Sequence, residues 1–119
     1  MQLRFSACVL LAGLGLAPGA EGAVAGPEPA PQTLVLRDHR FAPATLTVPA
    51  GQKVQVLLVN QDGATDEFDS RDLGVEELVT PHGQVSFSIG PLKPGTYAFM
   101  GEFHPDTAHG HVVAVEARP

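Results

Sequence analysis

Four potential metal donors lie within ten residues near the C-terminal end of the chain. Met100, Glu102, His104 and His109 supply a thioether, a carboxylate and two imidazoles. Their segment falls between two short strand-like runs, so we expect it to form a loop at one end of a β-structure. Imidazole and carboxylate side chains together make a mixed nitrogen and oxygen site, which suits Cu(II), iron, Zn(II) or Mn(II).

A second group of donors follows the longest apolar run. Asp66, Glu67 and Asp69 surround Phe68, and side chains alternate between faces if this segment is extended. If the two segments open at the same end of the fold, carboxylates meet imidazoles there. The predicted metal ligands are therefore His104, His109, Glu67, Asp69, Asp66, Met100 and Glu102. The sequence leaves open which carboxylate binds, and it favours His39 as a turn residue over a ligand.

The elements that must position these donors have the pattern of short strands. Runs with strand-like composition cover residues 33–36, 45–48, 53–60, 85–89, 96–99 and 112–116, and Gly, Pro and Asn turn signals separate them. Residues 71–80 fit either a short helical turn or a distorted edge strand. The sequence predicts an all-β fold, an antiparallel Greek-key β-sandwich of about 6–8 strands.

Alternation within these runs also predicts the core. The expected core residues are Leu34, Leu36, Phe41, Leu46, Val48, Val54, Val56, Leu58, Phe87, Ile89, Tyr97, Phe99, Val113 and Val115. Phe68 is expected to pack inward as well.

The first 25 residues have the pattern of a secretory signal peptide. Arg4 precedes an apolar run from residue 5 to 16, and Ala23-Val24-Ala25 offers a cleavage site. The run is too short to span a bilayer. We expect a signal peptide at residues 1–25, a Pro-rich linker at 26–32 and one domain at 33–117. The predicted signal implies export, and we expect a periplasmic location for the domain. The only cysteine, Cys8, lies inside the predicted signal, so the exported domain is expected to have no thiolate ligand.

Charge and motifs exclude several function classes. The formal net charge is −6, from 7 Lys and Arg against 13 Asp and Glu. An acidic chain without a basic stripe is a poor nucleic-acid binder and a reasonable attractor of cations. No nucleophile elbow surrounds a serine, and no Gly-rich run matches a phosphate-binding loop. We therefore expect metal ions as ligands, and no nucleic acid or organic substrate.

Several segments together resemble the cupredoxins. Pro49-Ala50-Gly51, the run from Gly90 to Phe99 and the His-rich loop after it are similar to that family. The resemblance implies that Gly101 stands at the position of the blue-copper cysteine, His104 at that of the histidine and His109 at that of the methionine. The upstream histidine of the family falls near Asp66. Blue-copper electron transfer is therefore not implied.

A narrower resemblance covers roughly residues 33–117. Asp38-His39-Arg40-Phe41, Asp66 to Ser70 and Gly101-Glu102-Phe103-His104 are similar to cysteine-less cupredoxins of bacterial ferrous-iron uptake operons. That resemblance implies copper as cofactor, with iron as the alternative, and oxidation of Fe(II) to Fe(III). It also implies an iron permease or other membrane components of iron uptake as partners. The alternatives are a non-redox copper or iron carrier and a metal-free interaction domain.

Overall fold

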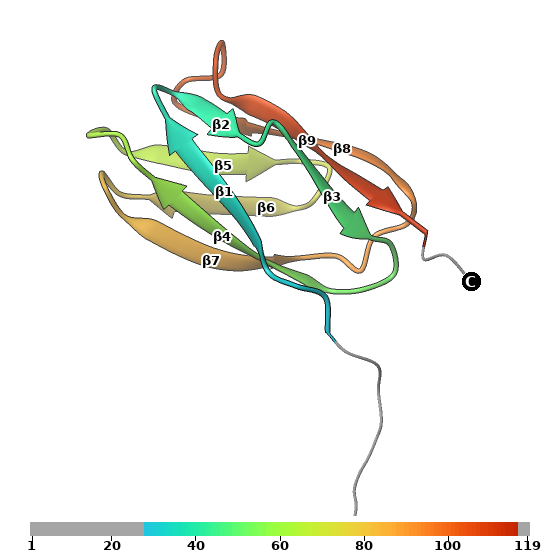
Figure 1. The fold of residues 1–119 in the computed structure, drawn as a ribbon. Coiled ribbons are helices and arrows are strands. Elements are labelled where there is room, and N and C mark those ends of the chain that lie inside the picture. The colour runs from blue at the N-terminus through green and yellow to red at the C-terminus, as the bar shows by residue number, and fades with distance from the viewer. Residues whose placement is uncertain (1–27, 117–119) are drawn as a thin grey trace, which may run out of the picture.

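The computed structural model describes residues 28–116, which fold into nine strands (Figure 1). The strands are β1 (Gln32–Arg37), β2 (Arg40–Ala42), β3 (Thr45–Pro49), β4 (Val54–Asn60), β5 (Asp66–Ser70), β6 (Val75–Val79), β7 (Gln84–Ile89), β8 (Gly95–Gly101) and β9 (His109–Val115). No part of residues 28–116 forms a helix with the length and apolar character needed to cross a bilayer. The predicted signal peptide, residues 1–25, lies outside the described residues.

The strands form two sheets that face each other as a sandwich. One sheet has the order β2-β1-β4-β7, and the other has the order β3-β9-β8-β5-β6. The all-β sandwich predicted from the sequence is confirmed. The purely antiparallel pairing is corrected, because β1 pairs with β4 and β3 pairs with β9 in parallel. Both sheets are therefore mixed.

Strand β4 shows why these residues form strands. Successive side chains of its sequence Val-Gln-Val-Leu-Leu-Val-Asn point alternately inward and outward, and the even-numbered residues Val54, Val56, Leu58 and Asn60 are buried. β-Branched and leucine side chains suit such a pleated, half-buried surface. The ambiguous stretch 71–80 contains the edge strand β6, and the short β2 and β6 bring the number of strands above the expected range.

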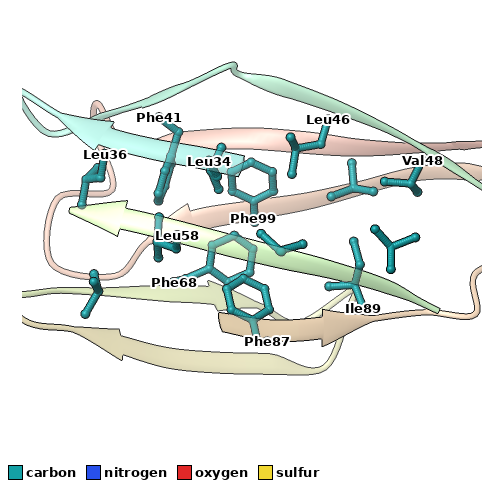
Figure 2. Packing of buried hydrophobic residues seen from close by; sticks show 14 of the residues in the cluster. Leu34, Leu36, Phe41, Leu46, Val48, Leu58, Phe68, Phe87, Ile89 and Phe99 are labelled. Carbon is teal, nitrogen blue, oxygen red and sulfur yellow. The ribbon is translucent and has the colours of Figure 1, made fainter. Parts of the chain in front are cut away.

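Four phenylalanines form the centre of the core (Figure 2). The ring of Phe68 lies 4.8 Å from that of Phe87, 4.9 Å from that of Phe99 and 6.1 Å from that of Phe41, measured between centroids. These rings come from strands of both sheets, so they join the two layers. Aromatic pairs at such separations add to the stabilisation that comes from burial.

The core prediction was wrong in β9. Val112 and Ala114 are buried, whereas Val113 is half-buried and Val115 is 44% exposed. Gly110 determines which residues of β9 point inward, because it pairs with Phe99 on β8 and itself faces the core. A Cβ on Gly110 would come within 2.7 Å of the Phe99 ring, so only glycine fits there. Tyr97 is also only half-buried, and its hydroxyl donates to the carbonyl of Lys93.

Candidate metal centre

Three connecting segments meet at one end of the sandwich (Figure 1). They are the β1–β2 turn at residues 38–39, the β4–β5 loop at 61–65 and the β8–β9 loop at 102–108. Contacts between their side chains, described below, join all three. We call this region the loop end. In a sandwich, loops at one end bring residues distant in sequence together on a rigid support.

Asp66 and His104 meet at the loop end. His104 Nδ1 lies 2.9 Å from Asp66 Oδ2. Asp66 is only 1% exposed, and its Oδ1 accepts hydrogen bonds from the amides of Glu67 and Phe103 at 2.8 and 3.0 Å. With a proton on Nδ1, the imidazole donates to the carboxylate and its Nε2 keeps a free lone pair. A carboxylate that fixes the tautomer in this way is the usual outer partner of a metal-binding histidine.

The β8–β9 loop holds His104 through its own backbone. The amide of His104 donates to the carbonyl of Gly101, and the amide of Ala108 donates to the carbonyl of His104 at 2.8 Å. The amide of Gly101 donates in turn to the carbonyl of Ala108 at 2.7 Å. Ala108 is fully buried, so this tight turn is fastened to the core. His104 therefore starts from a rigid backbone.

His39 and Asp62 were not among the predicted site residues, yet both lie at the loop end. The rings of His39 and His104 are stacked, with centroids 3.7 Å apart and planes 13° from parallel. Asp62 accepts hydrogen bonds from the amides of Asp38 and His39 at 2.7 and 2.9 Å. Burial would raise the pKa of Asp62, but these amides and the imidazoles of His39 and His104 outweigh it, so the pKa is lowered.

The loop around Asp62 is fixed by a buried amide side chain. Asn60 is 1% exposed, and its Nδ2 donates to the carbonyls of Ala64 and Thr80 at 2.8 and 3.1 Å. Its Oδ1 accepts from the amide of Asp62 at 2.9 Å. Both ends of the side chain thus have partners, as buried polar groups require. Asn60 ties the β4–β5 loop to the turn that follows β6.

The other predicted ligands face away from His104. The outer face of the five-stranded sheet carries Glu67, Asp69, Met100 and His109, because Phe68, Phe99 and Gly110 between them point inward. Glu102, the residue after β8, is on the same face because its carboxyl group contacts that of Asp69. Asp69 is in register with Met100, and Met100 with His109, so these three form a row across β5, β8 and β9. A groove of about 460 Å³ runs along this row.

Four carboxylates form an acidic patch on this outer face. They are Glu67, Asp69, Glu76 and Glu102, from β5, β6 and the residue after β8. The pKa of Glu102 is raised, mainly by a hydrogen bond between its carboxyl group and that of Asp69 and, to a smaller extent, by repulsion from the other carboxylates of the patch. Like charges this close favour a shared proton or a bound cation.

The seven predicted ligands therefore divide into two groups. Asp66 and His104 are in contact at the loop end, and the remaining five lie on the outer face. Among residues 28–116, no three His, Asp or Glu side chains converge closely enough to form a metal cluster by themselves. His104 and His39 are thus the imidazoles around which a site at the loop end would form.

Gly101 tests whether a blue-copper centre fits. A Cβ on Gly101 would lie 2.8 Å from Asp66 Oδ2 and 2.8 Å from the Cβ of Ala108, both closer than real contacts allow. The carboxylate of Asp66 thus fills the space that a cysteine side chain would need. The residues present do not fit a thiolate copper site, whereas imidazole donors alone suit copper, zinc or iron.

Comparison with known proteins places the chain in a family. Residues 7–114 match the family model of a cupredoxin-like domain. The chain belongs to the cupredoxin-like domain family. The uncharacterized protein RP394 of Rickettsia prowazekii (strain Madrid E) is 39% identical over 80 residues, which are 67% of this chain and 64% of that protein. The chain therefore spans less than two thirds of that relative's length.

Solved cupredoxins have a similar fold. Auracyanin A, a blue copper protein from the bacterium Chloroflexus aurantiacus, matches 72% of this chain and 98% of its own, with a TM-score of 0.63 and 15% identity. Amicyanin from Paracoccus versutus matches 71% of this chain and 81% of its own, with a TM-score of 0.56 and 17% identity. At these identities the likeness is one of fold alone.

Proposed function

We propose that this cupredoxin-like protein is exported to the periplasm, binds copper at the loop end without a thiolate, and assists iron uptake by oxidising Fe(II). The observation that carries the proposal is the contact between buried Asp66 and Nδ1 of His104, which leaves Nε2 available. Copper binding by relatives such as auracyanin A supports the choice of metal.

In this proposal His104 holds the metal through Nε2, and Asp66 holds the proton at Nδ1. Copper, when bound, supplies a one-electron acceptor for Fe(II). One Fe(II) then loses one electron to become Fe(III), and a partner protein in turn accepts that electron. Asp66 keeps the imidazole in one tautomer and one orientation throughout.

The acidic patch is the proposed approach site for the Fe(II) substrate. Its four carboxylates give a local negative potential, which raises the local concentration of cations. Hard carboxylate oxygens also stabilise Fe(III) more than Fe(II), because the higher charge gains more from anionic ligands. Glu102 joins the patch to the β8–β9 loop, since its amide donates to the carbonyl of Glu67 at 2.8 Å and His104 follows two residues later.

The test is oxidation of Fe(II) without oxygen. Protein loaded with one equivalent of Cu(II) is mixed with Fe(II), and Fe(III) formation is followed together with the Cu(II) paramagnetic signal. We expect one Fe(III) per Cu(II) and loss of the copper signal, and neither in His104→Ala. Tight Fe(II) binding without oxidation would instead support a carrier, and absence of stoichiometric copper binding would leave an interaction domain.

A charge variant tests the role of the acidic patch. Asp69→Asn should slow Fe(II) oxidation, most strongly at low salt, and leave copper affinity unchanged. Asp106→Asn is the matched control, because Asp106 is exposed in the β8–β9 loop outside the acidic patch. Equal rates for the two variants would contradict an approach through the acidic patch.

A further inference from the structure

We infer that His39 is the second metal ligand and that His39 and His104, the histidine pair, form a two-imidazole copper site. This inference rests on the proposed function, because it assumes that copper binds at the loop end. It adds a residue from the β1–β2 turn, far from His104 in the sequence, and dispenses with every carboxylate as a direct ligand at this position.

Each of the two rings has its Nδ1 on the side of a carboxylate, at different distances. His104 Nδ1 lies 2.9 Å from Asp66 Oδ2, and His39 Nδ1 lies 3.5 Å from Asp62 Oδ2. Among the described residues, neither Nε2 has a hydrogen-bond partner. His104 Nδ1 is hydrogen-bonded to its carboxylate, whereas His39 Nδ1 lies at a longer distance from Asp62, and in each ring Nε2 is the nitrogen that remains for a metal ion.

The two rings lie close together, and one of them must turn for both to bind one ion. An imidazole nitrogen binds a metal such as zinc at about 2.0–2.1 Å, so two nitrogens on one ion lie at most about 4.2 Å apart. The ring centroids are 3.7 Å apart and the planes are nearly parallel. Because the lone pair of Nε2 lies in the ring plane, the stacked rings direct their lone pairs side by side, and one ring must turn out of the stack before both bind one ion. His39 is the ring that can turn, because 43% of its side chain is exposed, against 28% for His104.

The backbone around His39 is held in an uncommon conformation. Asp38 and His39 have φ of +53° and +57°, the left-handed region that side chains other than glycine seldom adopt. The carboxylate of Asp62 accepts the amides of both residues, and this stabilises the turn. Strain of this kind persists only where surrounding contacts over-determine it. In this protein the left-handed turn places the imidazole of His39 over that of His104.

A packing role for His39 is the competing explanation, and one substitution separates the two. His39→Phe keeps an aromatic ring for stacking on His104 and removes both nitrogens. His111→Gln is the matched control, because His111 is an exposed histidine on the outer face of β9. Thermal unfolding of each metal-free variant measures the packing contribution separately.

The experiment counts the imidazoles on Cu(II) by pulsed electron paramagnetic resonance and measures affinity by competition with a chelator. We expect two imidazoles in the unaltered protein and in His111→Gln, one in His39→Phe, and at least a tenfold weaker affinity in His39→Phe. One imidazole in the unaltered protein, with affinity indifferent to His39→Phe, would overturn this inference and leave copper binding by His104 standing. No stoichiometric Cu(II) binding at all would overturn the proposed function as well.

Discussion

Asp66 is the residue on which the candidate centre most depends. It is a buried carboxylate with three donors, two from the backbone and one from His104. A buried charge is tolerated only when hydrogen bonds replace its lost hydration. The same contacts that stabilise the charge also orient the imidazole, so we expect one substitution here to change both stability and the proposed metal binding.

Replacing Asp66 with asparagine should weaken both properties. Asp66→Asn removes the charge and sets an amide nitrogen against a donor, so we expect a loss of about 1–3 kcal/mol in the free energy of unfolding. Loss of the carboxylate behind His104 should lower copper affinity by about 10–100-fold. Denaturant unfolding and chelator competition measure the two effects, with Asp106→Asn as control. Unchanged copper affinity would mean that Asp66 is structural only.

Gly101 is the second residue with a direct prediction. Gly101→Ala should cost about 1–3 kcal/mol, because its Cβ has no room beside Asp66 and Ala108. Gly63→Ala is the control, since a Cβ there meets only His82 Nε2 at an ordinary 3.7 Å. For the same reason, Gly101→Cys with Cu(II) should give no intense thiolate-to-copper absorption band. An intense band would show that the site can open for a thiolate.

Some residues of the candidate site could be predicted from the sequence. It placed His104 and Asp66 among the ligands, because both follow strands and could share one end. It did not place His39 beside His104. That contact depends on the left-handed turn at residues 38–39 and on Asp62, which lies 23 residues from His39. Sequence patterns do not encode how such distant turns meet.

At the scale of elements, side chains of β5 alternate between the interior, where the strand begins at the loop end, and the outer face that β5 shares with β6 and β8. Glu67 and Asp69 point outward while Asp66 and Phe68 point inward. Adjacent residues of one short strand therefore serve two different regions. The acidic patch and the histidine pair are neighbours along the chain, on different surfaces of the fold.

The acidic patch should leave a mark on the pH dependence of stability. Because the folded-state pKa of Glu102 is raised above its ordinary 4.5, the shared proton stabilises the fold below that pH. This contribution is lost as pH rises through the raised pKa. Glu102→Gln keeps a neutral donor, so its Tm relative to that of the unaltered protein should rise as pH increases from 4.5 through the raised pKa of Glu102. Glu116→Gln, outside the patch, is the control. A difference in Tm between Glu102→Gln and the unaltered protein that does not change with pH would contradict the shared proton.

Strand phase was harder to predict than strand existence. Residues 112–115 read Val-Val-Ala-Val, a continuous apolar run in which alternation gives no phase. The inward position of Gly110 opposite Phe99 fixes it, and only the pairing of β8 with β9 shows this. The correction matters for function, because the same phase puts His109 and His111 on the outer face.

At the scale of the whole molecule, the site depends on the core, which has 16 buried apolar residues among residues 28–116, nearly all of them on the two sheets. Apolar burial is the dominant favourable term in folding, and the part of the chain outside the predicted signal has no cysteine for a disulfide. The positions of the loops at the loop end therefore depend on the packing of this core.

Phe68 is the central member of that core. Phe68→Ala should lower the free energy of unfolding by about 3–5 kcal/mol, a large part of a total of about 5–15 kcal/mol. Leu78→Ala on the neighbouring strand is the control, since Leu78 is 58% exposed and should change stability by no more than about 0.5 kcal/mol. Similar values for both would contradict the assignment of Phe68 to the core.

The sandwich itself followed from the sequence, because strands and turns alternate at short intervals. The order of strands did not, since the parallel pairs β1–β4 and β3–β9 join segments without a hairpin between them. Local patterns predict hairpins well and long-range parallel pairs poorly. The family match supports the same architecture independently.

We propose that copper binds at the loop end through His104 and not on the outer face. A crystal structure of the protein with one equivalent of Cu(II), measured at the copper absorption edge, locates the ion directly. We predict one anomalous peak bonded to Nε2 of His104, with Nε2 of His39 as its neighbour. A peak in the row of Asp69, Met100 and His109, or no ordered copper, would contradict the account.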